Sequence, residues 1–71
     1  MLKADGFDEA IIGVGYTFDL RDGLLVYSVE KMLDMLVKRG MSREDAREYY
    51  EFNILGASLK GTPIFMEEYF G

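Results

Sequence analysis

Two adjacent helix patterns occupy the second half of the sequence and limit the folds open to it. Residues 28–39 form the first: Ser28 can cap the opening turn with its side-chain oxygen, and Gly40 permits a left-handed exit. Ser42 can cap a second helix at once, because only Gly40 and Met41 separate the two patterns. A link this short predicts a hairpin of two antiparallel helices.

The apolar residues of each pattern fall on one side of the expected helix. In the first helix they follow the i, i+3, i+4, i+7, i+8 spacing of a single buried face: Val29, Met32, Leu33, Leu36 and Val37. The second helix, which we expect to end at Gly56 or Gly61, has an inner stripe of Ala46, Tyr49, Tyr50, Asn53, Ile54 and Ala57. Two pairs of opposite charge at i, i+4 are expected outside: Asp34 with Lys38, and Arg47 with Glu51.

The first part of the chain has the two-residue period of a strand. Ile12, Val14, Tyr16 and Phe18 alternate with Gly13, Gly15 and Thr17. Asp22-Gly23 is a strong hairpin-turn signal, and residues 24–27 would form the returning strand. A two-residue turn at that point would pair two sets of side chains on one face of the sheet: Phe18 with Tyr27, and Leu20 with Leu25.

Two shorter segments complete the expected fold. Residues 5–12 fit either a short helical turn capped by Asp5 or an early start of the first strand, and both interpretations stay open. Residues 62–66 read as a strand with Pro63 at its start, where a missing amide is tolerated. We therefore expect a single α+β domain over residues 1–71, with order β-β-α-α-β and a small antiparallel sheet packed against the helical hairpin.

Composition excludes several classes of function. The 71 residues include no cysteine and no histidine, which removes thiolate and imidazole metal ligands and the commonest general base. We therefore expect no catalytic residues, no metal site and no cofactor. The net charge of −5 opposes nonspecific binding to nucleic acid. No signal peptide or apolar run of membrane-spanning length is visible, so a cytoplasmic protein without membrane contact is expected.

Three polar or side-chain-free positions invite a pocket interpretation. Gly13-Val14-Gly15 has the spacing of a phosphate loop but lacks the rest of such a motif, and a bulge or close packing is the plainer explanation. Asn53 falls in the apolar stripe, where a buried amide needs a hydrogen-bond partner. It either satisfies a loop backbone or contacts a ligand or partner. If the domain binds a small molecule, Gly13, Gly15 and Asn53 would line the pocket.

Acidic and aromatic side chains gather in the C-terminal half and suggest a surface for another protein. Aromatic residues are enriched at protein interfaces, and carboxylates can steer association with a basic groove. The chain has ten Phe and Tyr residues for a small interior, which also makes a homo-oligomer a reasonable expectation. The expected partner-binding residues are Glu44, Glu48, Glu51, Phe52, Glu67, Glu68, Tyr69 and Phe70.

Several stretches together resemble a group of known sequences. They are the run at 41–57 (MSREDAREYYEFNILGA), the run at 62–65 (TPIF), the segment at 8–15 (DEAIIGVG) and Val26-Tyr27. In these the chain resembles small proteins of unknown function from bacteriophages and metagenomic phage contigs. The resemblance implies a phage accessory protein in a bacterial cytoplasm that binds a protein target, inhibiting a host enzyme or a defence complex in the manner of an anti-CRISPR protein. The alternative is a homo-oligomeric structural or small-molecule-binding module.

Overall fold

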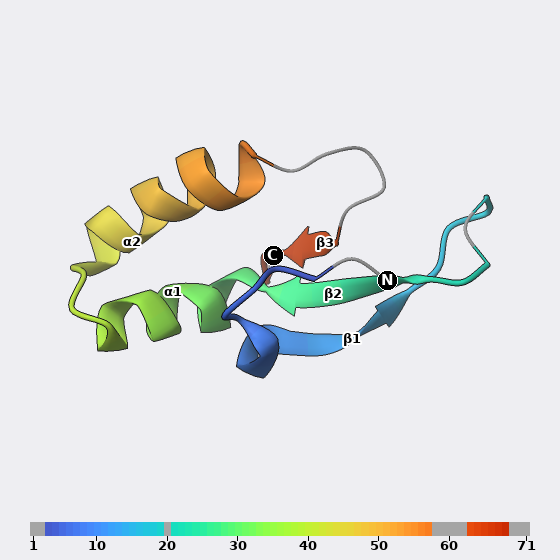
Figure 1. Ribbon diagram of the computed structural model, residues 1–71, viewed down its shortest axis with the longest axis horizontal. Helices are drawn as coiled ribbons and strands as arrows, with labels where there is room; N and C mark the ends of the chain where they lie inside the picture. Colours follow the sequence, from blue (N-terminus) through green and yellow to red (C-terminus); the bar gives the residue numbers. More distant parts are fainter. Residues whose placement is uncertain (1–2, 20, 58–62, 69–71) are drawn as a thin grey trace.

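The computed structural model describes residues 3–19, 21–57 and 63–68, and these form an α+β domain (Figure 1). The expected order β-β-α-α-β is confirmed. In chain order the elements are the 3₁₀ turn η1 (Asp8–Ala10), β1 (Ile11–Gly15), β2 (Leu24–Ser28), α1 (Val29–Lys38), α2 (Arg43–Tyr49), the π-helical turn η2 (Tyr50–Leu55) and β3 (Ile64–Met66).

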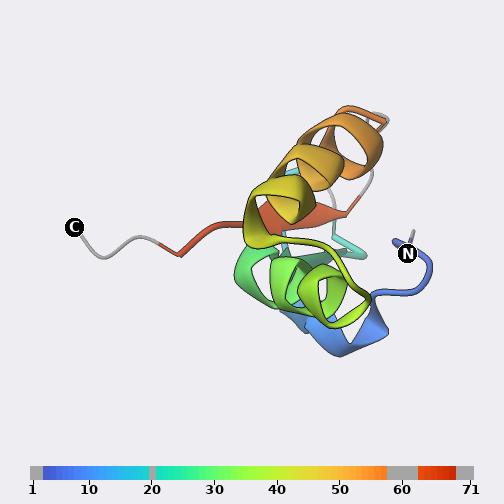
Figure 2. The same ribbon diagram turned by 90° about the vertical axis from the view of Figure 1, so that its left-hand side faces the viewer.

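Both helices of the hairpin begin at the predicted caps. The Ser28 side chain accepts a hydrogen bond from the Lys31 amide at 3.2 Å, and the Ser42 side chain accepts one from the Asp45 amide at 3.0 Å. Gly40 has a φ of 110°, the left-handed exit that the sequence indicated. Seen from the hairpin end, α1 and α2 stand in front of the strands (Figure 2).

The second helix changes type halfway along. Residues Tyr50–Leu55 wind as a π-helix and end at Gly56, whose amide donates to the Glu51 carbonyl at 2.9 Å. A Cβ added to Gly56 would lie 2.9 Å from that same oxygen, so the turn closes against a residue without a side chain. Of the predicted inner stripe, Ala46 and Tyr50 are buried and Ile54 is half-buried. Against prediction, the other members of the stripe are exposed: Tyr49, Asn53 and Ala57.

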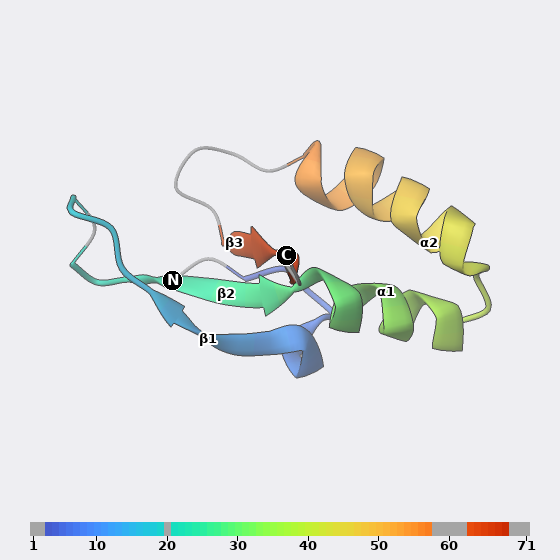
Figure 3. The ribbon, with the colours of Figure 1, turned by 180° about the vertical axis from the view of Figure 1, so that it is seen from behind.

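The sheet is mixed, where the sequence predicted an antiparallel one. β2 lies at the centre; β1 pairs with it antiparallel and β3 pairs with it parallel. The reason is the helical hairpin, because α1 leaves the end of β2 and α2 runs back beside α1 (Figure 3). The chain is thus returned to the starting side of β2, and the next strand runs in the same direction, as crossover connections require.

The register of β1 against β2 also differs from the prediction. Ile11 lies opposite Tyr27, and Gly15 lies opposite Leu24, with a bulge between residues 11 and 13. Phe18 therefore does not face Tyr27; it lies in the connection of residues 16–23, while the predicted partner Leu20 is outside the described residues. The predicted turn glycine is still needed, since Gly23 has a φ of 81° and an added Cβ would come within 2.6 Å of a Val14 methyl group.

The N-terminal segment sets that register by contributing to the core. Of the two interpretations of residues 5–12, a short turn precedes the strand: η1 covers Asp8–Ala10, and its N-cap is Phe7 rather than Asp5. Phe7 and Ala10 are buried, and the Arg39 guanidinium lies 4.9 Å from the centre of the Phe7 ring. The chain before Ile11 packs against α1 as η1, and β1 begins directly after it at Ile11.

The core lies between the helical hairpin, η1 and the adjacent end of the sheet. Tyr27 is fully buried, its hydroxyl accepts a hydrogen bond from the Ala4 amide at 2.8 Å, and its ring centroid is 5.9 Å from that of Phe65. Tyr50 packs edge-on against the same Phe65 ring, which ties η2 to β3. The buried apolar residues are Phe7, Ala10, Tyr27, Val29, Met32, Leu33, Leu36, Ala46 and Tyr50.

Candidate functional site

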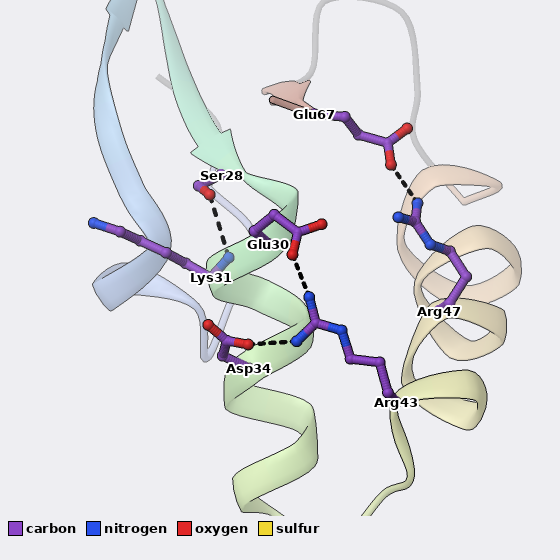
Figure 4. Close-up of polar contacts among 7 residues, drawn as sticks. All are labelled: Ser28, Glu30, Lys31, Asp34, Arg43, Arg47 and Glu67. Atoms are coloured by element: carbon purple, nitrogen blue, oxygen red, sulfur yellow. Dashed lines mark hydrogen bonds and ion pairs between the residues drawn. The ribbon is translucent and has the colours of Figure 1, made fainter. Parts of the chain in front are cut away.

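The two arginines of α2 point to neighbouring elements and are occupied within the fold (Figure 4). Arg43 forms ion pairs with Glu30 and Asp34 of α1, and Arg47 forms one with Glu67, just after β3. These hydrogen bonds raise the pKa of both guanidinium groups, the one to Asp34 being the main cause for Arg43 and the one to Glu67 for Arg47. Both arginines therefore stay charged and serve as bridges between elements.

Three carboxylates of α2 and η2 stay exposed to solvent, although Glu51 is close enough to Arg47 to raise the pKa of that guanidinium group. Glu44, Glu48 and Glu51 are exposed, and within the described ranges none of them forms an ion pair. Phe52 lies among them with 73% of its surface exposed, and Leu55 follows one turn later, 48% exposed. We call these five residues, Glu44, Glu48, Glu51, Phe52 and Leu55, the outer face of α2–η2.

A shallow hollow runs along one side of the outer face. It is about 430 Å³ in volume and is lined by Met41, Asp45, Glu48, Tyr49, Phe52 and Asn53. A second hollow of about 310 Å³ shares Tyr49 and Asn53 with it and continues toward Phe7 and Phe65. Asn53 thus stands exposed at the boundary of two hollows, where its amide is available to a partner. Sequence reasoning placed it in the core because an α-helical period was assumed through residue 57.

The three residues of the expected pocket are not brought together. Asn53 lies on η2, whereas Gly13 and Gly15 lie on β1 and line neither of the hollows that Asn53 lines. Gly15 has a packing role, because an added Cβ would come 3.0 Å from a methyl group of Ile64 and 3.1 Å from one of Val26. A Cβ on Gly13 would meet nothing within 4 Å. This arrangement gives the Gly13-Val14-Gly15 motif no anion-binding geometry.

The remaining expected partner-binding residues divide into three cases. Glu67 is committed to Arg47, so its charge is partly spent within the fold. Glu68 is exposed. Tyr69 and Phe70 lie outside the described residues. In the described part of the chain no three potential metal-ligating side chains of His, Cys, Asp or Glu come together, and none of the helices there has the length and apolar character needed to cross a bilayer.

Tyr50 is buried, and its hydroxyl makes the stability of the folded chain depend on pH in the alkaline range. Burial raises the pKa of its hydroxyl above the ordinary value of 10, and the Glu67 carboxylate adds to the shift while Arg47 opposes it. The unfolded chain therefore releases this proton at lower pH than the folded chain, so the stabilisation is complete below about pH 10 and is lost as pH rises further. We expect urea unfolding midpoints to fall between about pH 9 and pH 11, and to fall less steeply in Tyr50→Phe. An equal slope in both proteins would contradict this.

Comparison of the chain with protein families, curated proteins and solved structures finds no match.

Proposed function

We propose that this is a non-enzymatic binding protein that docks the outer face of α2–η2 on a basic surface of a protein target. One observation carries the proposal: the two arginines of α2 are paired with carboxylates of other elements, whereas three carboxylates of α2 and η2 are left exposed. Arg43 and Arg47 are held by carboxylates of α1 and of the segment after β3, while Glu44, Glu48 and Glu51 face outward without such partners in the described residues. The outer face is consequently more acidic than the helix sequence alone suggests.

The outer face also carries an exposed aromatic residue, which can anchor a partner that the carboxylates attract. Carboxylates raise the rate of encounter with a basic partner. Where they stay exposed to solvent in the complex, however, they add little to the binding affinity. Affinity in protein interfaces comes mainly from a few large side chains that become fully desolvated. Phe52, 73% exposed among the carboxylates, and the hollow beside it supply such a point of contact.

The class of target follows from the resemblance to phage proteins together with the charge of this face. A small acidic protein of this kind can block a basic functional groove of a bacterial enzyme or of a defence complex. We therefore propose inhibition by occlusion as the mode of action, in the bacterial cytoplasm and without chemistry of its own. Repulsion between the carboxylates and phosphate groups argues against a nucleic-acid partner.

The proposal is tested by removing the charge without changing shape. The triple variant Glu44→Gln, Glu48→Gln, Glu51→Gln should capture its target from bacterial lysate with about tenfold weaker affinity at low salt, roughly 1.4 kcal/mol. The difference should shrink at high salt, because screening weakens the wild type selectively. Captured proteins are quantified by mass spectrometry, and Kd is then measured on the purified target.

A matched control carries the same change of net charge elsewhere. Glu9, Asp19 and Asp22 are exposed carboxylates away from α2, and their replacement by Gln, Asn and Asn also adds three units of charge. This control should bind as the wild type does. Equal weakening by both triple variants would mean that only net charge matters and that the outer face is not the docking surface.

A further inference from the structure

A row of exposed apolar side chains runs along β1 and into the connection that follows. Ile12 and Val14 are each 41% exposed, Tyr16 is 70% exposed and Phe18 is 99% exposed. They occupy alternate positions, and in a two-layer domain such a row normally faces the core. Here the row is left outside, because the register places Ile11 rather than Phe18 opposite Tyr27. We call these four residues the β1 row.

Two residues of the β1 row, Ile12 and Val14, lie on an edge strand without the usual protection against pairing. β1 is the first strand in the order β1-β2-β3 and pairs on one side only, with β2, among the described residues. Exposed edges in natural proteins commonly carry lysine, proline or inward charges. Residues 10–18 contain no charged residue and no proline, although 30% of the whole chain is charged. The bulge at residues 11–13 is the one blunting feature present.

We propose that the β1 row is the contact between two copies of this chain, with β1 of one copy antiparallel to β1 of the other. A two-fold axis near Gly13, the middle of β1, would place Val14 of each copy opposite Ile12 of the other and join the two sheets edge to edge. Charge favours this occupant. Two copies that each have a net charge of −5 repel one another, and residues 10–18 form a long uncharged stretch where they can approach.

The area available fits a weak dimer. An aromatic side chain buries about 150–250 Å² when fully covered, so Tyr16 and Phe18 alone expose on the order of 300 Å² per copy. Edge pairing covers these side chains only in part, because strand side chains stand roughly perpendicular to the sheet. With Ile12, Val14 and the strand backbone, the total for two copies therefore stays below roughly 1,000 Å², the lower limit for a specific interface. We therefore expect a Kd in the range of about 10–100 μM rather than a permanent dimer.

The dimer does not depend on the proposed target and does not obstruct it. The ribbon of β1 and β2 extends away from the helices, so the β1 row and the outer face of α2–η2 lie at different ends of the molecule (Figures 1 and 3). Two copies joined through β1 would present two outer faces. Loss of either property should leave the other intact.

Sedimentation equilibrium of the whole chain over a range of concentrations tests this contact. The wild type should pass from monomer to dimer as concentration rises, and Phe18→Ser should raise Kd at least tenfold. Phe18 is almost wholly exposed, so this variant should keep the fold. Val14→Lys, which places a charge in the middle of the strand, should have a similar or larger effect.

The control is another exposed phenylalanine, at a distance from β1 along the chain. Phe52→Ser, on η2, should dimerise with the wild-type Kd. Amide hydrogen exchange of residues 11–15 should also slow with rising concentration in the wild type and not in Phe18→Ser. A wild type that remains monomeric at about 0.5 mM, well above the expected Kd, would overturn the proposal. So would a dimer that Phe18→Ser leaves unchanged while Phe52→Ser dissociates it.

Discussion

Replacing Leu33 with alanine should lower the free energy of unfolding by about 2–5 kcal/mol. Leu33 is 1% exposed and lies on the α1 face that forms the centre of the core with Met32 and Leu36. The truncation loses the favourable free energy of burying the removed methyl groups and leaves a cavity. In a core this small, few neighbouring side chains can move to fill it. Domains of this size have roughly 0.05–0.15 kcal/mol of stability per residue, so the variant should be partly unfolded at 37 °C.

The matched control for Leu33 is on the same helix. Val37→Ala removes apolar atoms from a residue that is 39% exposed, and it should cost less than about 1 kcal/mol. Urea unfolding followed by circular dichroism measures both variants. If Leu33→Ala were no more destabilising than Val37→Ala, the assignment of α1's inner face would be wrong.

Replacing Tyr27 with alanine should cost about 3–5 kcal/mol, the range for large aromatic truncations. Tyr27 joins three parts of the fold: it belongs to β2, its ring contacts Phe65 of β3, and its hydroxyl accepts from the Ala4 amide of the N-terminal segment. Its loss should therefore loosen the N-terminal segment and β3 together, which amide hydrogen exchange can detect as faster exchange in both.

Tyr27→Phe separates the hydroxyl from the ring. It keeps the packing against Phe65 but leaves the Ala4 amide without its acceptor, which should cost about 1–2 kcal/mol. Faster exchange should then be confined to the N-terminal segment. A cost for Tyr27→Phe equal to that of Tyr27→Ala would show that the hydrogen bond, and not the ring, dominates this position.

The helices could be predicted because their signals are local. Ser28 and Ser42 cap through amides three residues away, and Gly40 acts on the adjacent turn. The strand register could not be predicted in the same way. Alternation in residues 12–18 predicts a strand but not its register. The register depends on the N-terminal segment, where Phe7 and Ala10 are buried in the core just before β1, through contacts with residues distant in the sequence.

The sequence predicts exposed carboxylates on the second helix, and Glu44, Glu48 and Glu51 are exposed, but it does not predict the partners of the arginines. The i, i+4 rule paired Asp34 with Lys38 and Arg47 with Glu51, whereas Asp34 binds Arg43 across the helical hairpin and Arg47 binds Glu67 beyond β3. Sequence spacing identifies carboxylates on the same helix as possible partners. The arginine side chain is long enough to pair instead with a carboxylate that tertiary packing brings close. The exposure of Asn53 was missed as well, because a π-helical turn shifts every later residue around the helix axis.

The most direct measurement of the proposed function is photo-cross-linking from the outer face. A photoreactive phenylalanine analogue replaces Phe52 in one protein and Val37, a partly exposed position on α1, in another, and each is irradiated in bacterial lysate. We expect one dominant cross-linked protein from position 52. It should be lost when Glu44, Glu48 and Glu51 become Gln, and kept when Glu9, Asp19 and Asp22 are neutralised. The same product from position 37, or a product from position 52 that ignores the three glutamates, would contradict this expectation.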